Sequence, residues 1–173
     1  LTDVFRGFGD LLKQWYKSLF LKSRIIISEH QDNSPSVWDG YWDTKRHRGS
    51  YWLYDNIAEF YRCFLIKPCL EHFLRKYFAV GAHILHAGCG SGAVDAGAIK
   101  DFDIIAYDFS DRALEIYRDN NPIGAKLVKA NLLNSIIEGA PFDGIYNLGV
   151  MEHFSWLEID VILANFRRAL KPR

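Results

Sequence analysis

The chain has 173 residues, of which 49% are apolar and 24% charged, as is ordinary for a globular protein with room for one α/β domain. Its 21 basic and 21 acidic residues give a formal net charge of zero, which disfavours nucleic acid as a partner because such binders present a basic face to phosphates. No run of about 18 apolar residues exists, so no transmembrane segment is expected.

The first 80 residues are predicted to be mostly helical. Apolar residues recur at steps of three and four over residues 5–19, which indicates an amphipathic helix. Residues 28–50 are polar with interspersed aromatics and are predicted to form a loop. A second helix begins at Ser50, and Pro68 is expected to kink or restart it before its end near residue 79. Its expected buried stripe comprises Ile57, Tyr61, Phe64, Leu70, Phe73, Leu74 and Tyr77.

The three cysteines show no paired pattern. An odd number of this kind is typical of reduced thiols in a cytosolic protein, so a cytoplasmic location is expected. Cys63 and Cys69 are six residues apart and fall on different faces of a helix, so no metal site is predicted from them.

After Gly81 strands alternate with helices. The predicted strands are residues 83–87, 103–110, 125–131 and 142–149. A short helix is expected to follow the first strand and end near Lys100. The helix after the second strand is capped by Ser110, and the helix after the fourth strand begins at a capping-box pair, Ser155 and Glu158. The alternation predicts an α/β fold with a parallel, doubly wound sheet.

A turn with three glycines follows the first strand. Such a turn lets a ligand approach the backbone closely. Gly88, Gly90 and Ala93 match the loose pattern G-x-G-x-x-G/A, and Asp108 ends the next strand twenty residues after Gly88. A carboxylate at that place can accept hydrogen bonds from both hydroxyls of a ribose. Together these features predict a nucleoside-containing cofactor and do not choose among such cofactors.

Five motifs then follow one another in order: ILHAGCGSG, IIAYDFSDRALEIY, KANLLN, FDGIYNLGVMEHF and NFRRALKP. The series resembles the class I, Rossmann-like S-adenosylmethionine-dependent methyltransferases, particularly their small-molecule type 11 members. The resemblance covers residues 81–173, the cofactor-binding domain. Residues 1–80 share no motif with the family and resemble it only as a predicted helical cap of the type that many such enzymes carry over the cofactor. It implies S-adenosylmethionine as cofactor, S-adenosylhomocysteine as product, and methyl transfer to a small molecule of unknown identity.

The resemblance also implies roles for individual residues. The methionine arm of the cofactor would be lined by Ala87, Gly88, Gly90, Gly92, Asn147 and Leu148. The ribose hydroxyls would bind Asp108, and Phe109 would pack on the adenine. Asn131 stands where the family often has an Asp that accepts a hydrogen bond from the adenine amino group, and Leu132 would cover the other side of the ring. The cleft is expected between the first and fourth strands, where the strand order reverses.

Two departures from the family pattern bear on function. His86 stands where the family usually has an acid that helps the cofactor's ammonium, so weaker cofactor binding is expected, with His86 satisfied by neighbouring backbone. The stretch ALKPR resembles the turn before a fifth strand, and family members continue with three more strands. The sheet is therefore expected to be truncated after the fourth strand, as in a fragment or a protein completed by another chain or oligomer through the open edge.

The acceptor site is the least specified part. Methyl transfer places its hard chemistry in the cofactor, so no essential acid or base is predicted. His153 could deprotonate an acceptor, and Tyr41 and Trp42 are expected to close over cofactor or substrate. Two alternatives stay open: a catalytically silent cofactor-binding partner or regulatory subunit, and an NAD-dependent oxidoreductase.

Overall fold

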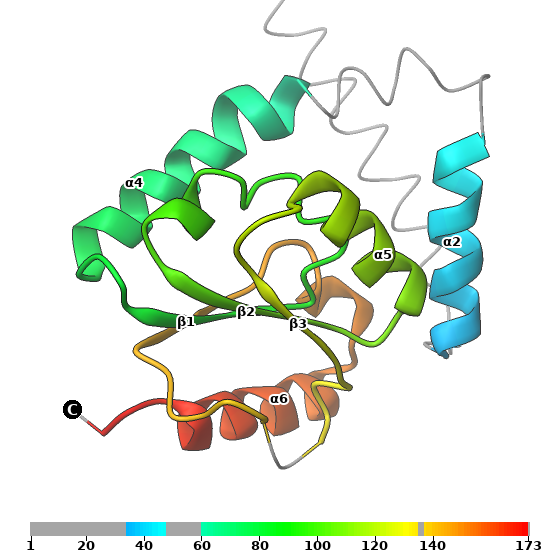
Figure 1. The fold of residues 1–173 in the computed structure, drawn as a ribbon. Helices are drawn as coiled ribbons and strands as arrows, with labels where there is room; N and C mark the ends of the chain where they lie inside the picture. The colour runs from blue at the N-terminus through cyan, green and yellow to red at the C-terminus, as the bar shows by residue number, and fades with distance from the viewer. Residues whose placement is uncertain (1–33, 48–59, 135–136, 173) are drawn as a thin grey trace, which may run out of the picture. The chain divides into compact units, whose positions relative to one another are not determined.

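A parallel sheet forms the centre of the computed structural model, which describes residues 34–47, 60–134 and 137–172. Its strands are β1 (His83–Ala87), β2 (Asp103–Asp108), β3 (Lys126–Lys129) and β4 (Gly144–Tyr146). They lie in the order β3-β2-β1-β4 (Figure 1). The order reverses between β1 and β4, which confirms the Rossmann-like α/β fold and places the switch point where the sequence predicted it.

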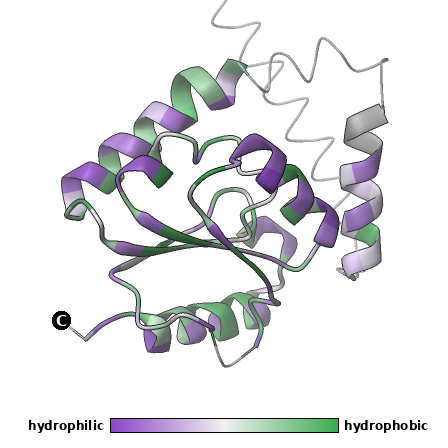
Figure 2. Cartoon of the chain, viewed as in Figure 1, coloured by the Kyte–Doolittle hydropathy of each residue, from purple (hydrophilic) through white to green (hydrophobic). Residues whose placement is uncertain are grey.

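Helices cover both faces of the sheet. Figure 1 shows α4 (Lys67–Tyr77) and α5 (Asp111–Asn120) on one side and α6 (Trp156–Ala169) on the other. The side chains of each strand alternate between the two faces, so Leu85 and Ile105 join the core beneath α6, whereas Ile84 and Ile104 pack against α4. Helices α4 and α6 each carry polar and apolar residues along their length, as amphipathic helices do (Figure 2).

The caps predicted for α5 and α6 are confirmed. Ser110 is the N-cap of α5, where its hydroxyl oxygen accepts a hydrogen bond from the backbone N–H of Ala113 at 3.1 Å. Ser155 and Glu158 form the complete capping box of α6. Pro68 lies in the first turn of α4, just after a π-helical segment, η2 (Arg62–Ile66), so the hydrogen-bonding pattern of the helix changes there; Ile66 and Lys67 keep helical backbone angles, and the helix is not interrupted as a restart would require.

Three local predictions are wrong. The polar stretch expected to be a loop contains a helix, α2 (Pro35–His47), with Pro35 as its first residue. The helix expected after β1 is replaced by turns and a short 3-10 helix, η3 (Ala98–Lys100), because Gly90, Gly92 and Gly97 oppose helix formation. Four residues of the predicted buried stripe are exposed: Tyr61, Phe64, Phe73 and Tyr77.

The fourth strand lies at the edge of the sheet, as expected. Past α6 the chain returns beside the start of β4, where the Phe142 N–H donates to Ala169 O at 2.8 Å and the Lys171 N–H donates to Phe142 O at 2.9 Å. The predicted helix over residues 5–19 and the predicted helix start at Ser50 lie outside the described residues. Within the described ranges no helix is both long and apolar enough to cross a membrane.

Candidate functional site

The glycine turn at the carboxyl end of β1 is tightly enclosed. Gly88 and Gly90 have φ angles of +71° and +52°, a region that favours glycine. A Cβ at Gly88 would lie 2.3 Å from Cγ2 of Val150, and one at Gly90 would lie 3.0 Å from Cζ2 of Trp42. Two segments distant in sequence, the one after β4 and α2, therefore converge on this turn.

Gly92 faces away from that convergence. A Cβ there would lie 2.2 Å from the Tyr117 ring of α5, so the absence of a side chain lets α5 pack against the turn. Ala87 is completely buried in the core beneath α6, which leaves only its backbone for a ligand. Roles for Gly92 and Ala87 at the methionine arm remain predictions.

Asp108 ties the end of β2 to the glycine turn. Its Oδ2 accepts a hydrogen bond from the Gly90 N–H at 2.9 Å, and its Oδ1 accepts one from the Ser110 N–H at 3.0 Å. Burial raises the pKa of this carboxyl, although hydrogen bonds from Ser110 and Gly90 oppose the rise. A carboxylate offers about four lone-pair sites, so its backbone hydrogen bonds leave room for a hydroxyl donor.

Asn131 and Leu132 follow the end of the neighbouring strand, β3. Asn131 is exposed, and its Oδ1 accepts a hydrogen bond from the Leu133 N–H at 3.0 Å in a local turn. Leu132 is 5% exposed and packs in the core beneath α6. The structure thus leaves Asn131 accessible and gives most of the Leu132 side chain to the core, while their contacts with adenine remain predictions.

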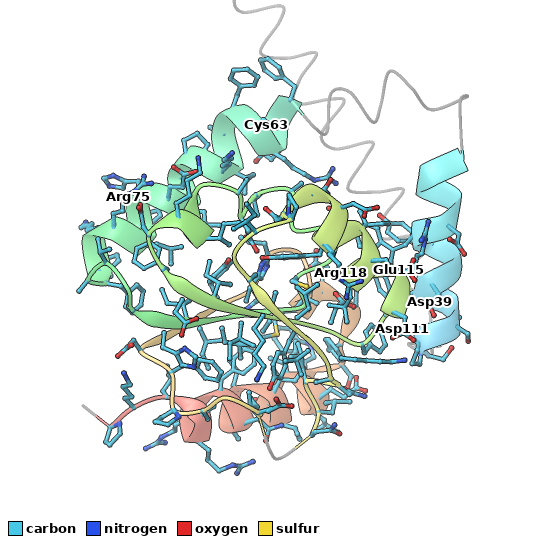
Figure 3. The ribbon with its side chains drawn as sticks, viewed as in Figure 1. Asp39, Cys63, Arg75, Asp111, Glu115 and Arg118 are labelled. Atoms are coloured by element: carbon cyan, nitrogen blue, oxygen red, sulfur yellow. The ribbon has the colours of Figure 1, made fainter. Side chains whose placement is uncertain are left out.

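Helix α2 lies against the N-terminal end of α5. Figure 3 shows Asp39 of α2 on the side of this helix that faces α5. The Ser110 hydroxyl donates to Asp39 Oδ1 at 2.5 Å, and the Arg112 N–H donates to the same oxygen at 3.3 Å. Nε of Arg112 also lies 2.8 Å from Oδ1 of Asp43. Asp39 therefore contacts the positive end of a helix dipole, where a carboxylate is stabilising.

The aromatic residues of α2 reach the predicted site. The Trp38 ring lies 4.7 Å from the His153 ring and 6.3 Å from the Phe109 ring, measured between centroids. Tyr41 is 44% exposed and contacts the ring of Trp42. Sequence reasoning named Tyr41 and Trp42 for this site but not Trp38. The spacing of Trp38 and Trp42, four apart on one helix face, is the signal that could have found it.

His153 ends a 3-10 turn, η4 (Met151–His153), beyond β4. Burial lowers the pKa of this imidazole below its ordinary value, against a smaller opposing influence from Glu152. His153 is therefore neutral at pH 7 and able to accept a proton. Asn147 and Leu148 lie between β4 and this turn, with Leu148 40% exposed.

His86 is held by a side chain, so the expected satisfaction by backbone is wrong. Its Nδ1 lies 2.7 Å from Oδ2 of Asp95, and both side chains are almost completely buried. The Tyr117 hydroxyl donates to Oδ2 of Asp95 at 2.7 Å, and the Tyr146 hydroxyl donates to Oδ1 at 2.9 Å. Sequence reasoning missed Asp95, although it is the single charged residue in the stretch 87–99.

The polar groups of this site fit the ribose of a nucleoside cofactor. The two glycines bring backbone to the carboxyl ends of β1 and β2, Asp108 keeps unused lone pairs, and aromatic rings of α2 cover the turn. These features lie at the switch point of the sheet, where open α/β folds bind ligands.

Comparison with known proteins identifies the family. A methyltransferase-domain model matches residues 84–173, just over half of the 173 residues. No curated protein matches the chain.

Solved structures share the fold. A TehB-like SAM-dependent methyltransferase from Corynebacterium glutamicum is 28% identical, with a TM-score of 0.53 over 58% of this chain and 55% of that one. DesVI of Streptomyces venezuelae is 20% identical, with a TM-score of 0.57 over 69% and 50% of the two chains. The magnesium protoporphyrin IX methyltransferase of Synechocystis, solved with bound SAM, is 13% identical, with a TM-score of 0.63 over 83% and 75%.

The likenesses to DesVI and to the Synechocystis enzyme concern the fold alone, since both identities are low. The chain spans about half the length of the first two of these structures, at 55% and 50%. The family match includes β1, the glycine turn, Asp108 and the segment after β4. The chain therefore belongs to the methyltransferase-domain family, the class I methyltransferases that depend on S-adenosylmethionine.

Proposed function

We propose that the protein transfers the methyl group of S-adenosylmethionine to a small-molecule acceptor. The observation that carries the proposal is the family match over residues 84–173, combined with the hydrogen bond that joins the Gly90 N–H to Asp108 inside that match. Family membership also disfavours the NAD-dependent alternative, which rested on the loose glycine pattern alone.

The cofactor-binding residues are proposed as the sequence predicted them. Asp108 holds the ribose hydroxyls with its unused lone pairs, and Phe109 and Asn131 bind the adenine, with Leu132 behind the ring. The methionine arm lies against the backbone of Ala87, Gly88, Gly90 and Gly92 and against Asn147 and Leu148. The convergence of Val150 and Trp42 on the glycine turn supports this placement.

When bound, the cofactor supplies an electrophilic methyl group on a sulfonium. The chain then has to align the acceptor, exclude water and remove a proton where the acceptor carries one. Trp38 and Trp42 exclude water by covering Phe109, His153 and Gly90. His153 is neutral at pH 7, so a ring nitrogen can take the acceptor's proton.

Aromatic surroundings favour a small acceptor with an apolar or planar part, because rings stack on such groups and on cations. A His153→Gln variant tests the proton step. Turnover is expected to fall by about 100-fold, as general bases contribute 10²–10⁴, while the affinity for S-adenosylhomocysteine stays unchanged. Equal turnover in both proteins would assign His153 a structural role.

The open edge of β4 supports a further proposal about partners. Apart from the contact at Phe142, β4 pairs with β1 alone among the described strands, so its outer edge can accept another segment or a second chain. Light scattering tests this: a mass above that of one chain supports an oligomer, and one chain's mass at all concentrations contradicts it.

We also propose that residues 1–80 form a helical cap. The three free cysteines support a reducing, cytoplasmic location, which we propose as well.

Two measurements test the function. Thermal shift with S-adenosylmethionine, S-adenosylhomocysteine and NAD is expected to show stabilisation by the first two only. Turnover against a panel of small acceptors, followed by the release of S-adenosylhomocysteine, is expected to identify a substrate. Binding without turnover on any acceptor would favour the silent partner subunit, and stabilisation by NAD alone would overturn the proposal.

A further inference from the structure

A closed group of polar side chains lies beneath the glycine turn. It consists of His86, Asp95, Tyr117 and Tyr146, which come from β1, the turn after it, α5 and β4. Asp95 is at its centre and accepts from three neighbours at 2.7, 2.7 and 2.9 Å. The His86 ring also stacks on Tyr146, with centroids 4.3 Å apart. Four converging polar residues in a core require a specific arrangement of protons.

The proton positions follow from the charges. Burial and the neighbouring Asp95 raise the pKa of Tyr117 and of Tyr146 far above neutral pH, so both hydroxyls keep their protons and donate. Burial works to raise the pKa of Asp95, but the electrostatic interaction and hydrogen bond with His86 and the hydrogen bonds from Tyr117 and Tyr146 outweigh it and leave that pKa lowered. Asp95 is therefore an ionised acceptor, and Nδ1 of His86 must be the nitrogen that carries a proton.

The other ring nitrogen, Nε2, has no hydrogen-bond partner among the residues that the structure describes. It is also not among the enclosed side-chain atoms of those residues that lack a hydrogen bond. The described residues therefore do not close Nε2 off. His86 is the last residue of the β1–β4 pairing and precedes Gly88 by two positions, so its ring belongs to the carboxyl end of the sheet.

We propose that Asp95 is a positioning residue that fixes His86 as the Nδ1–H tautomer, and that the bare Nε2 accepts a hydrogen bond from the ammonium of the cofactor's methionine arm. The inference rests on the proposed function. A carboxylate behind an imidazole both sets its tautomer and raises its basicity. Ionised Asp95 places a negative charge behind the imidazole ring, and this charge attracts an ammonium. The pair thus replaces the single acid of the family, and weak binding no longer follows from His86.

The test uses nitrogen-15 NMR of the histidine rings in the unaltered protein, with His86 assigned by its loss in His86→Gln. Two ligands separate the amino-acid arm from the nucleoside: S-adenosylhomocysteine has the ammonium, and methylthioadenosine lacks the arm. We expect the Nδ1–H tautomer in the free protein and a shift of the Nε2 resonance with S-adenosylhomocysteine but not with methylthioadenosine. An Nε2–H tautomer, a doubly protonated ring, or the same response to both ligands would overturn the inference.

Variants provide a second measurement. Asp95→Asn is expected to change the His86 tautomer and to lower the affinity for S-adenosylhomocysteine about tenfold, because one charge-assisted hydrogen bond is lost. The affinity for methylthioadenosine should change by less than about twofold. Tyr117→Phe is the matched control, since it removes a donor to Asp95 but leaves the contact with His86. An equal loss for both ligands would assign Asp95 a purely structural role. Failure of the unaltered protein to bind either ligand would contradict the proposed function instead.

Discussion

His86 and Asp95 depend on each other because both side chains are almost completely buried. His86 is 2% exposed and Asp95 is completely buried, so each polar group relies on the other and on two tyrosines. Removing one partner from a buried pair leaves an uncompensated group and is more costly than the pair is stabilising. The residues of the site can therefore be tested for stability separately from binding.

Replacing His86 by the acid usual in the family is expected to destabilise this protein. In His86→Asp a second carboxylate would face Asp95 in the core, and like charges at such a distance repel. We expect the free energy of unfolding to fall by about 3 kcal/mol in urea denaturation at pH 7. The double variant His86→Asp with Asp95→Asn removes the repulsion and should recover most of the loss. Equal stability of the single and double variants would contradict the pairing.

The contribution of Asp95 is expected to disappear in acid. Because its pKa is lower in the folded protein than in the unfolded chain, ionised Asp95 stabilises the fold above the unfolded value of about 3.9. That stabilisation is lost as pH falls through the folded pKa. The difference in unfolding free energy between the natural protein and Asp95→Asn should therefore be constant from pH 7 to pH 5 and shrink towards pH 3. A constant difference down to pH 3 would show that folding does not lower the pKa of Asp95.

Residue-level predictions from sequence succeeded where a motif fixed the backbone. The glycine turn and Asp108 meet as their spacing predicted, because a strand, a tight turn and the neighbouring strand end determine their positions. The contact between His86 and Asp95 could not be predicted, since Asp95 lies in a stretch of turns that sequence reasoning assigned to a helix. Its position depends on Gly92 allowing close approach of Tyr117.

At the scale of elements, α2 decides how open the glycine turn is. Its polar face contacts the N-terminal end of α5 through Asp39 and Asp43, and its aromatic face lies towards Phe109, His153 and Gly90. A helix held by two carboxylates at a helix terminus can keep bulky rings over a site without a large apolar interface. The arrangement makes α2 a cover for the turn.

Trp42→Ala is expected to uncover the glycine turn and leave the sheet intact, because Trp42 is only partly buried and belongs to no core cluster of the sheet. S-adenosylhomocysteine should then bind about tenfold more weakly, through faster dissociation measured by stopped-flow fluorescence. Tyr41→Ala provides the control, since Tyr41 is 44% exposed and contacts neighbouring rings of α2. Equal dissociation rates in all three proteins would show that α2 does not cover the ligand.

Elements with strong caps and alternating strands were predictable, and α2 was not. The capping residues of α5 and α6 and the strand β1 agree with their predictions because each carries its own local signal. In α2 the polar composition suggested a loop, yet Pro35 at the start and aromatic residues three and four apart are helix signals. The turns after β1 show the opposite case, in which three glycines prevent an expected helix.

At the scale of the whole molecule, sheet order links the fold to the proposed chemistry. The order β3-β2-β1-β4 brings the glycine turn, Asp108 and the segment after β4 to one edge, as a switch point does. This arrangement was predictable from the motif series because strand order is shared within the family, whereas the acceptor was not, since it depends on side chains that no motif specifies.

The central claim, that S-adenosylmethionine binds at the glycine turn with Asp108 on its ribose, is tested most directly by calorimetric titration with S-adenosylhomocysteine. The natural protein and Asp108→Asn are compared, because the amide keeps the shape but loses the charge and acceptor sites. We expect one ligand per chain in the natural protein and at least about tenfold weaker binding in the variant, titrated at a temperature at which it is folded, since Asn leaves one of the backbone N–H groups of Gly90 and Ser110 without an acceptor and lowers the thermal stability. No binding to the natural protein, or equal affinity in both, would contradict the account.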